Sequence, residues 1–347
     1  MSFDFADWAI VARKDDTGFG RAAADARNVL GLGLYFVCPS DRIEGRPPEG
    51  DDEFWLLPDM SKPELGALLS KAKGILFFEA YTTWHRELLT VAKDLGVKTV
   101  CIPMWEWFWG NDPMWQLCDL FACPTRFTVG VVKAGFGWKQ TEYVPWPLDL
   151  SRFQPREVNG PGRLLIHNAG LVDRDDRKGT GDTIRAFSKV RRKDIRLVVR
   201  MQKPAELPKI DSRMEVRVGN LEKAEQLYET GDVAIQPSKM EGIGFMVIEP
   251  LCVGLPVLTV DYPPMNEFVR QPEMLSRPKW FKRKAYATNW NKQSHLRPVR
   301  VSELARKIEW CCENDMGELS RANRKFAEVI FDPTHLRDVW AECLQKL

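Results

Sequence analysis

The sequence predicts an α/β protein of two domains, each a parallel sheet covered by helices. Short apolar runs alternate with amphipathic stretches along the whole chain, which is the pattern of repeated β-α-β units. The alternation pauses once, in the proline-rich segment 143–161, and then resumes. A length of 347 residues is also ample for two domains of ordinary size. We therefore place a linker in this segment.

Each half has its own series of expected elements. Before the linker the expected strands are residues 9–12, 34–38, 74–78, 98–102 and 120–123. Residues 20–30 and 85–95 are expected helices, and the second ends at Gly96, a residue suited to a helix C-terminus. After the linker the expected strands are residues 163–167, 195–200, 215–218, 233–236 and 256–260.

Composition excludes several classes of protein. Hydrophobic residues make up 44% of the chain and charged residues 28%, which is typical of a soluble globular protein. The net charge of +2 argues neither for nor against a polyanionic partner. The first residues are acidic where a signal peptide is basic, and no run reaches the roughly 18 apolar residues of a membrane span. We expect neither secretion nor membrane insertion, while peripheral membrane contact remains open.

The cysteines indicate a reducing compartment. The chain has eight cysteines, mostly inside apolar runs, and no pair is spaced as C-x-x-C. It has only four histidines, none of them near a cysteine pair. Buried thiols are therefore expected rather than a zinc site or disulfides, which favours a cytoplasmic location.

The stretch "KMEGIGFMVIEP", residues 239–250, holds the main candidate site. It follows an expected strand, so Glu241 lies in a loop at the carboxyl end, where α/β proteins bind ligands, and Glu249 lies inside the next helix. Gly242 and Gly244 let a ligand approach the backbone and leave the first helix amides to bind an anion. A phosphate would repel both carboxylates, so we expect them to bind neutral hydroxyls. The combination suits a nucleotide sugar.

Residues 231–269 resemble the signature region of the group 1 (family 4) retaining glycosyltransferases of GT-B fold, whose hallmark is E-x7-E. Glu241 and Glu249 have this spacing, with Pro-Ser before them and Gly-Leu-Pro-Val after them. The resemblance implies two Rossmann-like domains that face each other across a cleft. It also implies sugar transfer from a nucleotide-diphosphate sugar with retention of configuration, without a required metal or other cofactor. Two solvated acids on an ordinary helix remain the alternative.

The family pattern also implies a domain arrangement. Residues 1–150 would form the acceptor-side domain and residues 151–331 the nucleotide-sugar-binding domain. A terminal helix in residues 332–347 would cross back to the first domain.

The resemblance assigns donor roles to residues of both domains. Glu241 would bind hydroxyls of the donor sugar and Glu249 the ribose, while Lys178 and one arginine would offset the charge of the diphosphate. The arginine is ambiguous, because Leu171 stands where the family usually has it. The full set of candidates is Glu241, Lys178, Arg174 and Arg177 for catalysis, with Glu249, Gly242, Ile243, Gly244, Phe245, His167, Gly18 and Gly20 for donor binding. A solvated charged loop and a simple tight turn remain alternatives for the basic residues and for Gly18 and Gly20.

The first domain would supply the acceptor side. Glu79 follows one expected strand, and Trp105 and Glu106 follow another, so both loops are expected to face the cleft. The carboxylates are candidate acceptor bases, and the tryptophan would stack on a sugar or base. A tryptophan in such a cluster is equally expected in a hydrophobic core.

A basic and aromatic segment, residues 277–300, bears on the identity of the acceptor. It contains no acid, and its cations include Lys279, Lys282, Arg283 and Lys284, interleaved with aromatic residues. Such a pattern fits phosphates and exposed bases of a nucleic acid. A solvated charged loop and a contact with anionic lipid or acidic glycan are the alternatives.

Three functional hypotheses follow. The first is a phage-type glycosyltransferase that modifies a hydroxyl on a modified DNA base, in the host cytoplasm if it is phage-encoded. The second is a glycosyltransferase with a glycan or lipid-linked acceptor. The third is a non-catalytic protein that binds nucleotide sugar or nucleic acid. The sequence names neither the donor sugar nor the oligomeric state.

Overall fold

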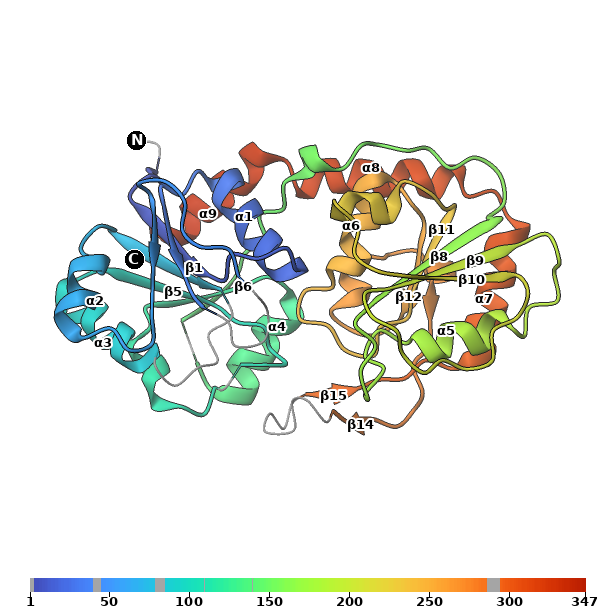
Figure 1. Ribbon diagram of the computed structural model, residues 1–347, viewed down its shortest axis with the longest axis horizontal. Coiled ribbons are helices and arrows are strands. Elements are labelled where there is room, and N and C mark those ends of the chain that lie inside the picture. Colours follow the sequence, from blue (N-terminus) through green and yellow to red (C-terminus); the bar gives the residue numbers. More distant parts are fainter. Residues whose placement is uncertain (1–2, 40–44, 79–84, 109, 139, 286–293) are drawn as a thin grey trace. The chain divides into compact units, whose positions relative to one another are not determined.

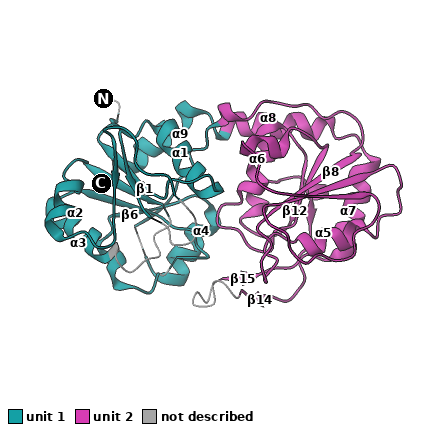
Figure 2. Cartoon of the chain, viewed as in Figure 1, with its two compact units in different colours: residues 1–149, 330–347 teal, residues 150–329 magenta. Residues whose placement is uncertain are grey.

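The chain divides into two compact units (Figure 2). The first contains residues 1–149 and 330–347, and the second contains residues 150–329. The computed structural model describes residues 3–39, 45–78, 85–108, 110–138, 140–285 and 294–347. Each unit is built on one parallel sheet (Figure 1), so the predicted α/β class is confirmed. The boundary between the units falls inside the proline-rich segment 143–161.

The first unit has a seven-stranded parallel sheet of order β3-β2-β1-β4-β5-β6-β7. Its strands are β1 (Trp8–Ala12), β2 (Leu34–Val37), β3 (Glu53–Trp55), β4 (Gly74–Phe78), β5 (Lys98–Ile102), β6 (Leu120–Cys123) and β7 (Thr141–Tyr143). Its helices are α1 (Gly18–Leu30), α2 (Lys62–Leu69), α3 (His85–Leu95), α4 (Arg126–Gly130) and α9 (Pro333–Leu344). The order reverses between β1 and β4, so ligands would bind in this sheet at the loops that follow these two strands.

Local signals explain where helix α1 begins and ends. It begins at Gly18, two residues before the expected start, because the hydroxyl of Thr17 accepts a hydrogen bond from the Phe19 amide and caps it. It ends at Gly31, whose φ of 76° is readily adopted only without a side chain.

The terminal helix α9 belongs to the first unit and packs against α1. Arg337 Nε donates to the main-chain oxygen of Val29 at 2.6 Å. Trp340 Nε1 donates to the main-chain oxygen of Pro145 at 2.9 Å. The last helix of the chain is therefore held by segments that lie far from it in sequence.

The second unit has a six-stranded parallel sheet of order β10-β9-β8-β11-β12-β13. Its strands are β8 (Leu164–Gly170), β9 (Arg196–Met201), β10 (Met214–Val218), β11 (Val233–Gln236), β12 (Val257–Val260) and β13 (Leu275–Ser276). Its helices are α5 (Thr180–Phe187), α6 (Phe245–Val253), α7 (Val301–Glu313) and α8 (Gly317–Ile330), the last of which ends at the unit boundary. A separate antiparallel pair joins β14 (Arg283–Lys284) to β15 (His295–Leu296).

The strand order of the second sheet reverses between β8 and β11, which are neighbours. The chain leaves β8 toward β9 on one side and leaves β11 toward β12 on the other. Right-handed crossovers then place α5 and α6 on opposite faces of the sheet, as Figure 1 shows. The loops after β8 and β11 therefore meet at the point where open α/β sheets bind ligands.

Within the described ranges, no helix is both long and apolar enough to cross a membrane.

Candidate functional site

Two loops of the second unit bring the predicted donor residues together. The loop after β8 carries the charged residues 173–178, and the loop after β11 carries residues 237–244. The two loops approach each other closely at Gly179, where a Cβ would lie 2.4 Å from the main-chain oxygen of Pro237. The Lys239 amide also donates to the Arg177 main-chain oxygen at 2.7 Å. We call this pair of loops the switch-point site.

The glycines of the second loop shape the start of helix α6. Gly244 has a φ of 95°, in the left-handed region that favours glycine, and it is the residue directly before the helix. Gly244, the N-cap residue of α6, has no side chain that could cap this end. The Ile243 side chain is buried at 3% exposure, so Ile243, like the glycines on either side of it, would offer a ligand only its backbone. The first turn of α6 is consequently suited to an anion.

Lys178 and Glu241 form an ion pair inside the switch-point site. Lys178 Nζ lies 2.6 Å from Glu241 Oε1, and the Glu241 side chain is only 6% exposed. Burial would raise the pKa of Glu241, but the Lys178 ammonium and the Arg177 guanidinium outweigh burial and hold the pKa below its usual value. Glu241 is therefore an ionised hydrogen-bond acceptor at neutral pH.

The structure separates the two candidate arginines by position. Arg177 is partly buried and close enough to Glu241 to stabilise its carboxylate form. Arg174 is exposed on the same loop. Of the two, Arg177 is the one that joins the Lys178–Glu241 pair.

A second charged cluster in these loops was missed by the sequence analysis. Lys239 is 4% exposed, and its Nζ lies 2.8 Å from Asp176 Oδ2 and 3.5 Å from Asp182 Oδ2. Asp176 Oδ1 also accepts a hydrogen bond from the Thr180 amide at 2.8 Å, in the first turn of α5. A carboxylate therefore already occupies the N-terminal end of α5, which makes this end poorly suited to a phosphate. The only sequence signal was the density of charge in residues 173–182.

Glu249 has a protein partner. The Tyr228 hydroxyl donates to Glu249 Oε2 at 2.7 Å, and the two residues are 0% and 8% exposed. Burial and the neighbouring Glu249 carboxylate raise the pKa of Tyr228 well above its usual value, so the phenol stays protonated. The expectation of a ligand for this buried acid is thus only part of the explanation, because the fold itself satisfies one carboxylate oxygen.

His167 connects three elements of the second unit. It is fully buried, its Nδ1 donates to the Ile235 main-chain oxygen at 2.7 Å, and its Nε2 accepts from the Thr180 hydroxyl at 2.9 Å. Burial lowers the pKa of His167 to about 4, so the ring is neutral at physiological pH. Both ring nitrogens join β8 to β11 and α5, while contact with the donor stays a prediction.

Comparison with known families agrees with this geometry. Residues 163–287, which include the whole switch-point site, match the model of the family Glycosyl transferases group 1. The matched residues all lie in the second unit. No curated protein matches the chain in sequence.

Solved structures with glycosyltransferase folds resemble the whole chain. A glycosyltransferase from Rickettsia africae ESF-5 has a TM-score of 0.68 at 11% identity, over 98% of this chain and 99% of that one. HepE of Anabaena, solved with UDP and glucose, has a TM-score of 0.69 at 12% identity, over 98% and 100%. Sucrose-phosphate synthase from Thermosynechococcus elongatus has a TM-score of 0.66 at 13% identity, over 98% of both chains. The predicted GT-B fold, with two Rossmann-like domains, is confirmed.

Outside the residues that match the family model, the first loop of the first unit was expected to approach the donor. A Cβ at Gly20 would lie 2.3 Å from the main-chain oxygen of Asp15, so the local turn requires glycine there. At Gly18 nothing lies within 4 Å of such a Cβ. Gly20 thus has a structural reason to be glycine, whereas the backbone at Gly18 has open space beside it.

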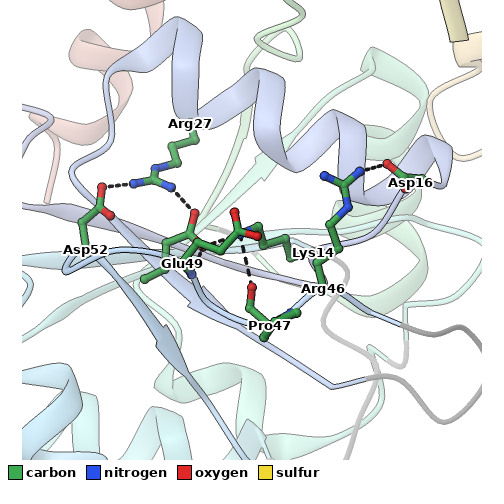
Figure 3. Close-up of polar contacts among 8 residues, drawn as sticks. Lys14, Asp16, Arg27, Arg46, Pro47, Glu49 and Asp52 are labelled. Atoms are coloured by element: carbon green, nitrogen blue, oxygen red, sulfur yellow. Dashed lines mark hydrogen bonds and ion pairs between the residues drawn. The ribbon is translucent and has the colours of Figure 1, made fainter. Parts of the chain in front are cut away.

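An ion network holds this region of the first unit in place (Figure 3). Lys14 Nζ lies 2.6 Å from Glu53 and 3.1 Å from Glu49. Arg27 of α1 lies 2.7 Å from Glu53 and also pairs with Asp52. The network ties the end of β1 and helix α1 to the start of β3.

The acceptor-side candidates have different outcomes. Glu79 lies outside the described residues. Trp105 is 1% exposed and its ring packs edge-on against Phe127, with ring centroids 5.0 Å apart. Glu106 is 3% exposed. The burial of this ring agrees with the alternative of a core tryptophan, and its role as a stacking platform stays a prediction.

The basic segment of the second unit presents its charges to solvent. Lys282, Arg283 and Lys284 are exposed, and Trp280 is 85% exposed. Lys279 is partly buried, with its Nζ 5.6 Å from the centre of the Phe281 ring. The central part of the segment, residues 286–293, lies outside the described residues.

This segment is attached directly to the switch-point site. The Arg297 amide donates to the Lys239 main-chain oxygen at 2.8 Å, two residues before Glu241. The Ser294 hydroxyl lies 3.0 Å from the Met240 sulfur. The base of the basic segment is therefore connected through hydrogen bonds to the loop that carries the motif.

Proposed function

We propose that the protein is a retaining glycosyltransferase that moves a sugar from a nucleotide-diphosphate sugar to an acceptor hydroxyl. The observation that carries the proposal is the 2.6 Å Lys178–Glu241 pair beside the start of α6, which follows Gly244, at the reversal of strand order. It supplies a cation and helix amides for a diphosphate next to a carboxylate for sugar hydroxyls. HepE, whose structure contains UDP and glucose, supports a UDP-sugar as the first donor to test.

The donor residues divide by charge. Lys178, Arg177 and the amides of residues 242–245 would bind the diphosphate and stabilise its charge as it leaves, which is often the largest contribution to catalysis. Glu241 would bind hydroxyls of the transferred sugar, and Glu249 would bind the ribose. No step of this scheme requires a metal ion.

For the acceptor, we propose a hydroxyl on a modified DNA base. Support comes from the exposed cations Lys282, Arg283 and Lys284 and from Trp280, on a segment whose base contacts the loop of Glu241. Cations bind phosphates and an exposed indole stacks on a base. The alternative is a glycan or lipid-linked acceptor, since anionic examples of either would bind the same cations.

We further propose a cytoplasmic location, which would be the host cytoplasm for a phage-encoded enzyme. All eight cysteines are free thiols, and seven of them are buried. Reducing compartments maintain thiols in this state.

The donor assignment is tested with UDP-glucose and related sugar nucleotides. The wild-type protein should hydrolyse one of them slowly without acceptor and gain thermal stability in its presence. Glu241→Gln should lose transfer by at least about 100-fold, the usual range for a group that stabilises the transition state, while retaining nucleotide binding. Glu222→Gln, an exposed acid of the same unit, is the matched control. Full activity of E241Q would refute the role of Glu241, and absence of turnover and thermal shift with every donor would favour a non-catalytic protein.

The acceptor assignment is tested with a radiolabelled sugar nucleotide and three acceptors: hydroxymethylated DNA, a lipid extract and an oligosaccharide. We expect label in the DNA. Label found only in lipid or oligosaccharide would contradict a DNA acceptor while leaving the transferase assignment intact.

A further inference from the structure

Strand β10 forms one edge of the sheet in the second unit. Its five residues, "MEVRV", pair only with β9 in this sheet. Glu215, Arg217 and Val218 are exposed, and Val218 is 51% exposed. An exposed edge is a template for another strand, unless charges or bends prevent pairing.

The hydrogen bonds to β9 show which groups of β10 face outward. The Leu197 amide donates to the Arg213 main-chain oxygen, and the Gly219 amide donates to the Met201 oxygen. Odd-numbered residues therefore direct their backbone groups to β9. Because direction alternates along a strand, Val216 and Val218 direct their N–H and C=O groups away from the sheet.

The side chains of β10 are complementary to a second copy that runs antiparallel. When Val216 lies opposite Val216 of the second copy, Glu215 lies opposite Arg217 and Arg217 opposite Glu215. On the other face, Met214 lies opposite Val218. Opposite charges and apolar pairs in directly facing positions stabilise antiparallel strands. The same alignment places the outward backbone groups of Val216 in a hydrogen-bonded pair.

The charges on this edge thus permit one pairing and oppose others. Arg217 Nε now lies 2.7 Å from Glu215 Oε1 within the strand, and these side chains are 49% and 57% exposed. An exposed pair of this kind contributes less than about 1 kcal/mol. Breaking the pair within each copy, so that Glu215 and Arg217 can pair with the other copy instead, therefore costs little. A parallel copy in the same register would instead place like charges opposite each other, which is unfavourable.

We propose that β10 is a homodimerisation edge, at which a second copy of this chain adds its own β10 antiparallel about Val216. The two six-stranded sheets then form one continuous sheet with a two-fold axis. The occupant is the chain itself because the sequence of the edge is complementary to its own reverse in charge and in apolar character. This proposal is independent of the catalytic assignment.

Charge reversal tests the proposal by measuring the mass of the full chain by light scattering and sedimentation. The wild-type protein should be a dimer. E215R and R217E should each be monomers, because each places two pairs of like charges across the axis. Mixing the two variants should restore a dimer of one copy of each, and the double swap E215R/R217E should restore a homodimer. E157R, which reverses an exposed charge paired with Arg321 elsewhere in this unit, should remain dimeric.

Cross-linking gives a second measurement that does not depend on charge. Facing Cα atoms in a hydrogen-bonded antiparallel pair are about 5.5 Å apart, and disulfides span about 4.4–6.8 Å. Oxidised V216C should therefore form a covalent dimer. V218C should not, because the two copies of position 218 lie more than about 13 Å apart along the strands.

A monomeric wild-type protein at high concentration would overturn the proposal. So would a dimer that persists in both E215R and R217E, because another surface would then hold it. Thermal melting of each variant verifies that it is folded. Because neither E215R nor R217E has a wild-type β10, association between them would show that charge complementarity holds the dimer together.

Discussion

Tyr228→Phe tests how the buried acid of the motif is stabilised. The substitution removes a single oxygen, the hydroxyl that donates to Glu249 Oε2 at 2.7 Å, and preserves the ring. Tyr228 is completely buried and Glu249 is 8% exposed, so water cannot easily replace the lost donor. A carboxylate deprived of a hydrogen bond in such a place loses part of its stabilisation in the folded state only.

The expected magnitude follows from that burial. Leaving one buried acceptor without its donor costs about 1–3 kcal/mol of unfolding free energy. For a domain the size of the second unit, about 2 kcal/mol corresponds to a fall in melting temperature of roughly 4–8 °C. Tyr35→Phe is the matched control, because that buried hydroxyl donates to the neutral main-chain oxygen of Arg13 at 2.7 Å. The control should lose less stability, since hydrogen bonds to charged groups are stronger.

The pH dependence gives the sign of the effect. Burial and Glu249 raise the pKa of Tyr228 in the folded protein above the value of 10.0 expected for an unfolded chain. The hydroxyl therefore stabilises the fold fully below pH 10, and the stabilisation declines as pH rises further, because only the unfolded state loses the proton there. Above pH 10, the difference in unfolding free energy between the wild-type protein and Y228F should decrease by about 1.4 kcal/mol per pH unit.

The assay is thermal and denaturant unfolding of four proteins at neutral and alkaline pH: wild type, Y228F, E249Q and the double variant. Removing the Tyr228 hydroxyl should cost less in the E249Q background, because the acceptor is no longer charged. Two results would show that Tyr228 does not stabilise the Glu249 carboxylate. One is an equal melting temperature of Y228F and the wild-type protein at neutral pH. The other is an equal loss of unfolding free energy on removing the hydroxyl in the wild-type and E249Q backgrounds.

Three further predictions concern the loops of the switch-point site and are measured by thermal melting. Between pH 6.5 and pH 4 the wild-type protein should lose about 3 kcal/mol of unfolding free energy, because in that interval only the unfolded chain takes up the histidine proton. His167→Gln should remove this loss, and an unchanged pH profile would contradict the low pKa of His167. Gly179→Ala should destabilise more than Gly160→Ala. Both have a similar positive φ, which costs about 1–2 kcal/mol with a side chain, but only at Gly179 would the new Cβ meet an atom 2.4 Å away; equal losses would contradict the contact. Lys239→Met should cost about 3–5 kcal/mol because it removes the buried ammonium between Asp176 and Asp182. Arg185→Met should cost less than about 1 kcal/mol, because the Arg185 side chain that pairs with Asp182 is 51% exposed; similar losses would refute the cluster.

The strands of this fold were predictable because their signals are local. The limits of β4, β5, β6 and β11 agree with the apolar runs that predicted them. Helix α6 begins after one glycine and ends at another, Gly254, whose φ is 93°. Short apolar runs have few alternatives in a chain of repeated β-α-β units, and glycine marks positions that other residues seldom adopt.

The partners of the motif residues could not be predicted in the same way. Lys178 and Glu241 are 63 residues apart, and Tyr228 precedes Glu249 by 21. Nothing in the local pattern distinguishes Lys239, which is buried between aspartates, from the exposed lysines of the basic segment. A side chain at a given position becomes a core residue or a ligand contact only through neighbours from other elements, as Trp105 and His167 show.

The sequence by itself determined the α/β class, the linker segment and the motif that places two acids around a glycine-rich helix start. These follow from residue type and spacing, which act over a few turns of chain. Only the tertiary structure decided that Lys178 pairs with Glu241, that Tyr228 donates to Glu249, and that Asp176 caps the start of α5. Those outcomes depend on which strands are neighbours in the sheet, because strand order brings loops distant in sequence within hydrogen-bonding distance.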